Sequence, residues 1–472
     1  MQMLIAGEWV DTADTIPVNN PFDNSTVDTV PKASADDIDR AMAFAAEGAR
    51  KLRKVPGHDR YLWLMRAAEL MKERLDDLGQ TITLEEGKIL AEGKGEVGRA
   101  IETMIGSAEE AKRLGSEVVP LDGSPGAGNA FGFTIRVPCG VVLAVTPFNF
   151  PLNLVCHKVG PALAAGNSII IKPATDTPLV CLKFARCLLD AGVPPEAVQV
   201  VTGSGGTIGD LICSDPRVRK ISFTGSKEIG ERICRTAGLK KVTMELGSNA
   251  PVIVLPDADL EKAANAIATT GFSNAGQVCI SAQRIIAHKD IYGDLIDALK
   301  PVADGFSTGN PLEGGVKCGP MVRVEDAVRV EGWVNEATAG GARIVAGGER
   351  DGAVYAPTVL ADVHPDMKIS REEVFGPTVG LTPVANVDEA IAYANDTSYG
   401  LSAAIFTENL DNAMKFAREV DSGNIHINWG TQWRADLMPY GGLKDSGFGK
   451  EGPKYAVQEM SESKMVVMHL KG

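Results

Sequence analysis

The sequence lacks paired cysteines, long apolar runs and a basic leader. Eight cysteines stand at positions 139, 156, 181, 187, 213, 234, 279 and 318, and no CxxC pair indicates a zinc site or a redox dithiol. In a chain of 472 residues they are typical of reduced thiols, so we expect a cytoplasmic protein. The first ten residues, MQMLIAGEWV, have no basic region and no apolar run long enough for a signal peptide or a membrane span.

Positive charge is also scarce. The 47 lysines and arginines face 61 aspartates and glutamates, which gives a formal net charge of −14. Such a chain is not suited to follow nucleic acid or an anionic membrane, and we expect neither as a partner. If the protein binds an anion, a few local cations must do it. The length favours about three domains, and we find no internal repeat.

Short apolar strands alternate with helices from Val141 onward. This alternation predicts an α/β fold with parallel sheets covered on both faces. Ser34 is a candidate N-cap for a helical region that runs to about Leu114. Residues 117–136 and the tail, residues 464–470, are strand-like, and the tail has no obvious partner nearby. We expect these two segments to form a projecting sheet that pairs with another subunit. The expected strands are 141–145, 168–171, 197–201, 219–223 and 251–255, and the expected helices are 178–191, 227–237 and 260–270.

Cys279 lies in the stretch Asn-Ala-Gly-Gln-Val-Cys-Ile-Ser, between a helical pattern and the strand-like residues 283–288. Gly276 permits a tight turn and a close approach of the backbone to a ligand. A thiol presented on such a turn is a strong nucleophile toward a carbonyl carbon. The alternative is that Cys279 is a small buried apolar residue, as free cysteines often are.

Two further residues follow predicted strands. Glu245, in Thr-Met-Glu-Leu-Gly-Ser, is a candidate general base if its surroundings raise its pKa, or else a surface glutamate in a turn. Asn149, in Thr-Pro-Phe-Asn-Phe-Pro, is held by two prolines and has an amide suited to an oxyanion hole. The alternative for Asn149 is a turn residue that bonds its own backbone.

Two stretches suit a dinucleotide. Ile-Ile-Ile-Lys-Pro-Ala ends a strand with Lys172, which is placed to meet a ribose or a phosphate. A second stretch, Phe-Thr-Gly-Ser-Lys-Glu-Ile-Gly, runs from a strand into a helix and contains Gly225 and Gly230. The backbone N–H groups at the start of a helix can bind pyrophosphate. The second stretch is not GxGxxG, so an ordinary strand end and helix start are the alternatives.

Taken together, the stretches PFNFP, IIKPA, FTGS, MELG, GQVC and EEVFGP resemble the non-acylating aldehyde dehydrogenases in order and spacing, over nearly the whole chain. The resemblance implies that Cys279 is the nucleophile, Glu245 the base that activates the deacylating water, and Asn149 the oxyanion donor. It implies NAD or NADP as cofactor and no metal. The positions that match cofactor contacts are Thr146, Pro147, Phe148, Lys172, Thr175, Gly205, Gly225, Ser226, Gly230, Leu246, Glu373 and Phe375.

The resemblance also implies two doubly wound parallel-sheet domains and a small β flap for oligomerisation. The expected boundaries are 1–116 with 137–247 for the dinucleotide-binding domain, 248–440 for the catalytic domain, and 117–136 with 441–472 for the oligomerisation strands. A homodimer or homotetramer is expected. Two positions depart from the family pattern. Thr175 stands where many NAD-preferring members carry a glutamate, so we expect NADP to be tolerated or preferred, although Asp176 lies next to it. Ser248 stands where a second glycine is more common, and we expect little effect from it.

The substrate is expected to be a small aldehyde with an anionic tail. Arg434 and His157 lie in stretches that approach the substrate tunnel in the family, and Arg99 offers a second cation. The arrangement resembles the branch that acts on lactaldehyde, phosphonoacetaldehyde, sulfolactaldehyde or glyceraldehyde 3-phosphate. A structural ion pair for Arg434 and a satisfied buried histidine for His157 are the alternatives.

Three other functions stay open. A succinate-semialdehyde-type or general short-chain aldehyde dehydrogenase shares the same motifs. Coenzyme-A-acylating relatives generally lack a glutamate like Glu245, so its presence favours hydrolysis over transfer to a thiol. A non-catalytic scaffold of the same fold predicts loss of Cys279 or Glu245, and both are present.

Overall fold

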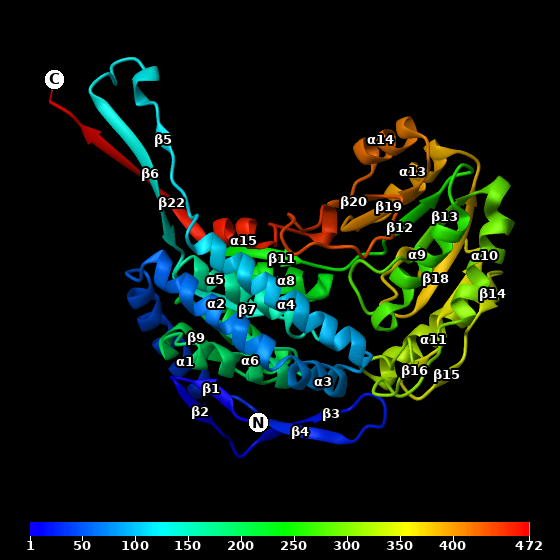
Figure 1. Cartoon of the computed structure of the whole chain (residues 1–472), viewed down its shortest axis with the longest axis horizontal. Helices are drawn as coiled ribbons and strands as arrows, with labels where there is room; N and C mark the ends of the chain where they lie inside the picture. Colours follow the sequence, from blue (N-terminus) through cyan, green and yellow to red (C-terminus); the bar gives the residue numbers. More distant parts are fainter. Residues whose placement is uncertain (472) are drawn as a thin grey trace.

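Two large sheets and a projecting flap make up the molecule, as Figure 1 shows. The computed structural model describes residues 1–471. The first sheet has eight strands in the order β2 (Glu8–Val10), β1 (Met3–Ile5), β9 (Val198–Val200), β8 (Ser168–Lys172), β7 (Val141–Val145), β10 (Val218–Thr224), β11 (Lys241–Glu245) and β21 (Gly447–Phe448). Its central strands, from β9 to β11, are parallel. Continuous apolar runs such as Ser-Ile-Ile-Ile-Lys in β8 are fully buried, as expected for a sheet covered on both faces.

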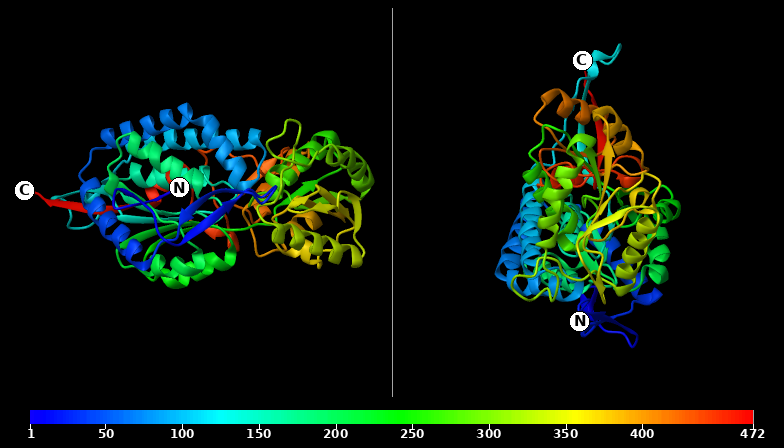
Figure 2. Two further views of the ribbon diagram at one scale, coloured as in Figure 1. Left: turned by 90° about the horizontal axis from the view of Figure 1, so that it is seen from below. Right: turned by 90° about the vertical axis from the view of Figure 1, so that its right-hand side faces the viewer.

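The second sheet has seven strands in the order β14 (Arg343–Ala346), β17 (Thr358–Ala361), β18 (Thr378–Val384), β13 (Arg284–His288), β12 (Pro251–Val254), β19 (Ser402–Phe406) and β20 (Asn424–Ile427). All of its pairings are parallel except β14 with β17. This part is at the right of Figure 1 and is seen from two other sides in Figure 2. The α/β prediction is confirmed, while the predicted domain boundaries stay a prediction.

Helices cover the two sheets. The bounds are α1 (Ala35–Leu52), α2 (Gly57–Glu73), α3 (Leu75–Glu86), α4 (Leu90–Ala111), α5 (Asn153–Ala164), α6 (Leu179–Asp190), α7 (Gly205–Ser214), α8 (Lys227–Ala237), α9 (Leu260–Phe272), α10 (Tyr292–Asp304), α11 (Val324–Ala339), α12 (Lys368–Arg371), α13 (Val387–Asn395), α14 (Leu410–Glu419) and α15 (Pro453–Glu459). Ser34 caps α1 as predicted. Its side chain accepts the backbone N–H of Asp37, and the Asp37 side chain accepts the backbone N–H of Ser34. Among residues 1–471, no helix is both long enough and apolar enough to cross a bilayer.

The flap joins segments far apart in the sequence. Strand β6 (Ala130–Pro138) pairs with β22 (Ser461–His469) along nine residues and with the short β5 (Val118–Val119). The tail strand, for which the sequence offered no partner nearby, therefore pairs with a segment more than 300 residues earlier. The remaining strands form two small ribbons, β3 (Thr15–Asn19) with β4 (Thr26–Pro31) and β15 (Arg350–Asp351) with β16 (Val354–Tyr355).

Candidate active site

The parallel order of the first sheet brings four predicted site segments to one edge. In register, Val145 of β7 lies beside Lys172 of β8 and beside Phe223 of β10, and Thr224 lies beside Glu245 of β11. These are the carboxyl ends of the strands, where open α/β sheets bind ligands. Lys172, Glu245 and the residues around Asn149 and Gly225 therefore converge although up to about a hundred positions separate them.

Cys279 reaches this edge from the second sheet. It follows a tight turn between α9 and β13, in which Asn274 and Ala275 both have a φ of 51° and Gly276 a φ of 66°. The close approach predicted at Gly276 is real, but its neighbour is protein backbone and not a ligand. A Cβ on this residue would lie 2.1 Å from the carbonyl oxygen of Gly376, so only glycine fits.

Asn149 is tied to the cysteine turn. Its Nδ2 donates one hydrogen bond to the carbonyl oxygen of Gln277, at 2.8 Å, and does not bond its own turn as the alternative interpretation held. An amide nitrogen carries two hydrogens, so one remains for a substrate oxygen. Lys88 holds the backbone of Asn149 in place, because its Nζ donates to the Asn149 carbonyl at 2.8 Å and to Glu96 at 2.7 Å.

Cys279 and Glu245 have altered acidities. Burial raises the pKa of the Cys279 thiol to about 12, while the 3.2 Å contact with the Tyr440 hydroxyl acts in the opposite direction. Burial and the Glu451 carboxylate raise the pKa of Glu245 well above its usual range. Neither carboxyl oxygen of Glu245 has a hydrogen-bond partner within the described chain. A buried carboxyl group with a raised pKa is a strong base once it has lost its proton.

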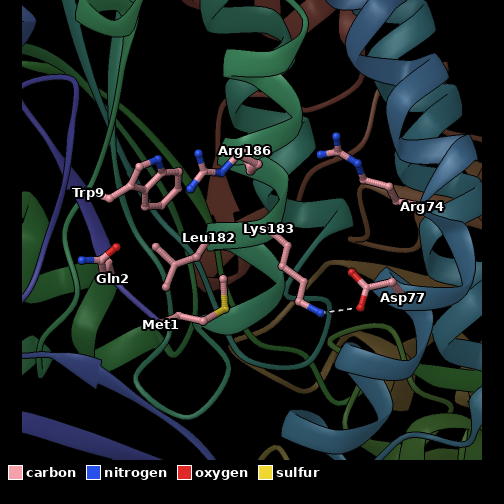
Figure 3. Close-up of a pocket in the computed structure, with 8 residues that line it drawn as sticks. All are labelled: Met1, Gln2, Trp9, Arg74, Asp77, Leu182, Lys183 and Arg186. Atoms are coloured by element: carbon pink, nitrogen blue, oxygen red, sulfur yellow. Dashed lines mark hydrogen bonds and ion pairs between the residues drawn. The ribbon is translucent and has the colours of Figure 1, made fainter.

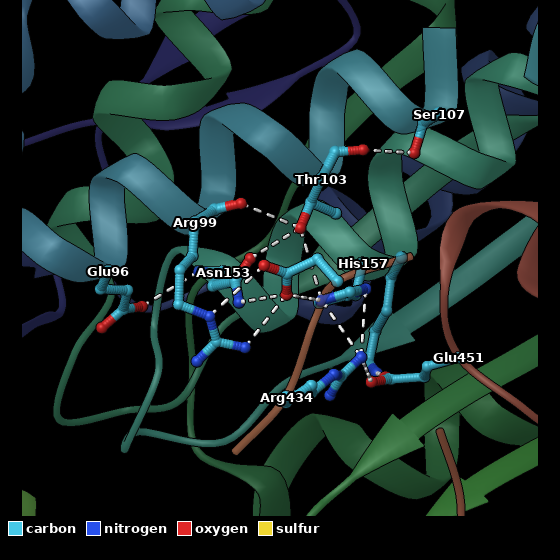
Figure 4. A network of polar contacts seen from close by, with 10 residues as sticks. Glu96, Arg99, Thr103, Ser107, Asn153, His157, Arg434 and Glu451 are labelled. Atoms are coloured by element: carbon cyan, nitrogen blue, oxygen red, sulfur yellow. Dashed lines mark hydrogen bonds and ion pairs between the residues drawn. The ribbon is translucent and has the colours of Figure 1, made fainter. Parts of the chain in front are cut away.

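The three residues predicted to bind the substrate, Arg99, His157 and Arg434, belong to one polar network, drawn in Figure 4. Arg434 donates to Glu451 at 3.2 Å, and Arg99 donates to Asp436 at 3.0 Å. His157 is buried, with Nε2 2.9 Å from Asp436. Both predicted alternatives are therefore realised in part, since Arg434 makes an ion pair and His157 is a satisfied buried residue.

His157 brings no positive charge to this network. Burial, together with the nearby Arg434, lowers the pKa of its imidazole to about 4, so it is neutral at pH 7. The expectation that an arginine and a histidine together attract an anion is corrected here, because only the arginine is charged.

Sequence reasoning missed four partners in and beside this network: Lys158, Asp436, Tyr440 and Glu451. Lys158 donates to Glu451 at 2.9 Å. Asp436 and Tyr440 follow Arg434 closely in the chain, and this proximity was the signal available. Lys158 and Glu451 had no comparable signal.

A cavity of about 600 Å³ adjoins Cys279 between the two sheets. Most of the predicted cofactor positions line it; Lys172, Gly205 and Gly230 are not among the lining residues. The predicted residues that line it are Thr146, Pro147, Phe148, Asn149, Thr175, Gly225, Ser226, Leu246, Cys279, Glu373 and Phe375. Phe375 has a φ of 46° and contacts Phe148 edge to face.

The cavity suits a nicotinamide dinucleotide. Ser226 caps α8, whose free N–H groups open into the cavity beside Gly225. A Cβ on Gly225 would lie 2.5 Å from the Phe223 ring, and one on Gly247 would lie 2.3 Å from a Glu373 oxygen, so a larger residue at either position would displace these side chains. Glu373 accepts the Ser248 N–H at 2.9 Å, which holds its carboxylate at the wall of the cavity.

Another hollow lies near the N-terminus, between the first strands and α6 (Figure 3). Its cations are engaged: Lys183 donates to Asp77 at 2.5 Å, Arg74 donates to Asp190 at 2.6 Å, and Arg186 lies over the Trp9 ring. None of the sequence-predicted site residues lines this hollow, so the cavity beside Cys279 is the candidate active site.

Comparison with known proteins agrees with this geometry. Residues 9–466 match the model of the "Aldehyde dehydrogenase family". The chain belongs to the aldehyde dehydrogenase family. The enzyme is 47% identical over 468 residues to 3-sulfolactaldehyde dehydrogenase of Priestia aryabhattai, covering 99% of this chain and 98% of that protein.

Two other relatives are similar over their full length. NADP(+) succinate-semialdehyde dehydrogenase GabD of Escherichia coli is 38% identical and covers 99% of this aldehyde dehydrogenase and 98% of its own chain. The crystal structure of glyceraldehyde-3-phosphate dehydrogenase GapN from Methanocaldococcus jannaschii, complexed with NADP, is 38% identical with a TM-score of 0.94, and the match covers 98% and 100% of the two chains. The predictions of the fold and of an NAD(P)-dependent aldehyde dehydrogenase are confirmed.

Proposed function

We propose that this aldehyde dehydrogenase oxidises a short aldehyde with an anionic tail to the acid, with Cys279 as nucleophile, Glu245 as base and Asn149 as oxyanion donor. One observation carries the choice of tail. Arg434 is buried at the substrate side, and its Nε has no hydrogen-bond partner in the described chain although Glu451 engages another nitrogen. A buried guanidinium N–H without a partner is costly, and a bound anion would satisfy it.

The charges around Arg434 point the same way. Three cations, Arg99, Lys158 and Arg434, face the two carboxylates Asp436 and Glu451. Burial acts to raise the pKa of both carboxyls. At Asp436 the hydrogen bond with His157 and the charge of Arg99 outweigh it, and at Glu451 the charges of Lys158 and Arg434 do, so both pKa values lie well below the usual range. His157 is neutral, and the raised pKa of Glu245 favours its protonated form. Among these five residues the cations exceed the carboxylates by one, which an anionic substrate would neutralise; Glu96, also drawn in Figure 4, is paired with Lys88.

The residues act in a defined order. The Cys279 thiol first gives its proton to water, and the thiolate sulfur then attacks the aldehyde carbon. The new oxyanion accepts hydrogen bonds from the free hydrogen of Asn149 Nδ2 and from the backbone N–H of the turn. A nicotinamide bound in the cavity is the hydride acceptor. Glu245 then takes a proton from the water that hydrolyses the Cys279 thioester, and the acid is released.

Sulfonate is the tail to test first, because the relative with 47% identity is named for 3-sulfolactaldehyde. The test compares kcat/KM for 3-sulfolactaldehyde, lactaldehyde, succinate semialdehyde and propanal by the absorbance of the reduced cofactor. We expect the anionic aldehydes to exceed propanal. Preference for propanal over every anionic aldehyde would refute an anion-binding site.

Arg434→Ala is expected to lower kcat/KM for the preferred anionic aldehyde by roughly ten- to a hundredfold, since a charged hydrogen bond is worth about 1.5–3 kcal/mol. Propanal oxidation should fall by much less, because propanal has no anionic tail for Arg434 to bind and loses only the support that Arg434 gives the nucleophile. Arg434→Lys keeps the charge and is the matched control, which should retain more of the anionic activity. Because Arg434 also holds Glu451, a melting curve must show that each variant is folded. Equal losses for charged and neutral aldehydes would assign Arg434 a structural role.

The cofactor preference is proposed to include NADP at least as well as NAD. Thr175 lines the cavity without a carboxylate, and the neighbouring Asp176 is neutralised by Arg323, whose Nε lies 3.1 Å from Asp176 Oδ1. The repulsion that Asp176 would exert on a 2′-phosphate is therefore weakened.

Thr175→Glu should lower kcat/KM for NADP by at least about tenfold while sparing NAD, because it places an anion beside the ribose. Thr175→Gln, with the same length and no charge, is the control. A wild-type enzyme that favours NAD by about tenfold, or about 1.4 kcal/mol, would contradict the proposal.

We also propose a homodimer or homotetramer in the cytoplasm. The flap exposes apolar side chains such as Val118, Phe131, Met465 and Leu470, which a partner subunit would cover. The eight cysteines are free in the structure, as a reducing compartment requires. Light scattering of the purified enzyme measures the assembly directly.

A further inference from the structure

Tyr440 joins the nucleophile to the substrate-side cation. Its hydroxyl oxygen lies 3.2 Å from Cys279 Sγ, and the Arg434 guanidinium carbon lies 3.8 Å from the centre of its ring. Tyr440 is only 3% exposed. Cys279 Sγ is the one hydrogen-bond partner that the described residues give its hydroxyl, so the phenol has no competing contact.

The direction of this hydrogen bond follows from the state that the nucleophile must reach. Burial raises the pKa of both the Tyr440 phenol and the Cys279 thiol. Attack on an aldehyde carbon needs the sulfur as a thiolate, so the sulfur is the group that loses its proton. A thiolate has no hydrogen to give, so from that point the phenol O–H is the donor.

Arg434 strengthens the donor. A cation over the face of an aromatic ring attracts its electron density, which makes the attached hydroxyl a better hydrogen-bond donor. The guanidinium is 5% exposed, so water screens this effect only weakly.

We propose that Tyr440 is a further catalytic residue, which donates a hydrogen bond to the Cys279 thiolate and increases the fraction of the nucleophile that is ready to attack. Tyr440 keeps its own proton throughout, and no bond forms to it. The contact matters most before attack, because the sulfur loses its negative charge when it bonds to carbon. The proposal rests on Cys279 being the nucleophile.

The test follows alkylation of Cys279 by iodoacetamide, with the modified peptide quantified by mass spectrometry between pH 7 and 9.5. Tyr440→Phe keeps the ring and removes only the hydroxyl. A charged hydrogen bond shifts a pKa by about one to two units. Part of the lost thiolate is offset by the greater reactivity of the more basic sulfur. We therefore expect alkylation to be about three- to tenfold slower, and kcat/KM to fall by a similar factor.

Tyr393→Phe is the matched control, since Tyr393 also bonds a side-chain hydroxyl, that of Ser370 at 2.6 Å, and also has an arginine, Arg284, over its ring. It should leave Cys279 alkylation unchanged. If Tyr440 only fills space, Cys279 in the Tyr440→Phe variant will be alkylated at the wild-type rate or faster, and the proposal is overturned. An unchanged kcat/KM would overturn it as well. Failure of the underlying assignment is seen separately, as turnover by Cys279→Ala.

Discussion

Cys279→Ala is expected to lower kcat by more than about a thousandfold, since no other residue is placed to form the thioester. Cys279 is the only cysteine among the described residues that line the cavity, and it stands on the turn that Asn149 holds by its 2.8 Å bond to Gln277. Alanine preserves the turn, because neither the φ angles before it nor the Gln277 carbonyl depends on the sulfur.

Cofactor binding should survive this change. Trp333 lines the same cavity, so quenching of its fluorescence by NADP gives a dissociation constant without turnover. Cys139→Ala is the control, because Cys139 is also half-buried and lies outside the cavity. Turnover by Cys279→Ala above a trace would remove the cysteine from the mechanism, whereas loss of both turnover and cofactor binding would mean that the site had collapsed.

Glu245→Gln should separate the two halves of the reaction. Acylation does not need the carboxylate, so a burst of reduced cofactor close to one per active site is expected. Steady-state turnover should then be about a hundred- to a thousandfold below wild type, because the amide cannot take a proton from water. Glutamine has nearly the same shape, and neither oxygen of Glu245 has a hydrogen-bond partner in the described chain that the change would break.

The stalled species is a thioester, and its mass is that of the enzyme plus the acyl group when the intact protein is weighed after the burst. Glu261→Gln, an exposed position on α9, is the control and should turn over normally. Normal steady-state turnover by Glu245→Gln would show that another base activates the water. A variant without a burst would place Glu245 in the acylation half instead.

The local pattern of apolar residues was enough to predict the strands and helices that carry the site. Strand β7 and helix α8 begin and end where their apolar patterns do, because burial on both faces of a sheet or on one face of a helix leaves a signal in the sequence. Helix α9 extends two residues beyond its predicted end at Thr270, and β9 covers Val198–Val200 where 197–201 was expected. Such shifts are usual at element ends, where the sequence signal is weakest.

The sequence by itself determined which residues we propose for the chemistry: Cys279 on its glycine turn, Glu245 at a strand end, and Asn149 between prolines. Only the tertiary structure decided the pKa values and charges at the site. Tyr440 contacts Cys279 across 161 positions, Asp436 binds His157 across 279, and Glu451 meets Arg434 across 17. The acidity of a buried group depends on the charges and hydrogen bonds that packing places around it, and residues so far apart in the chain become neighbours only when the two sheets and the C-terminal segment are assembled.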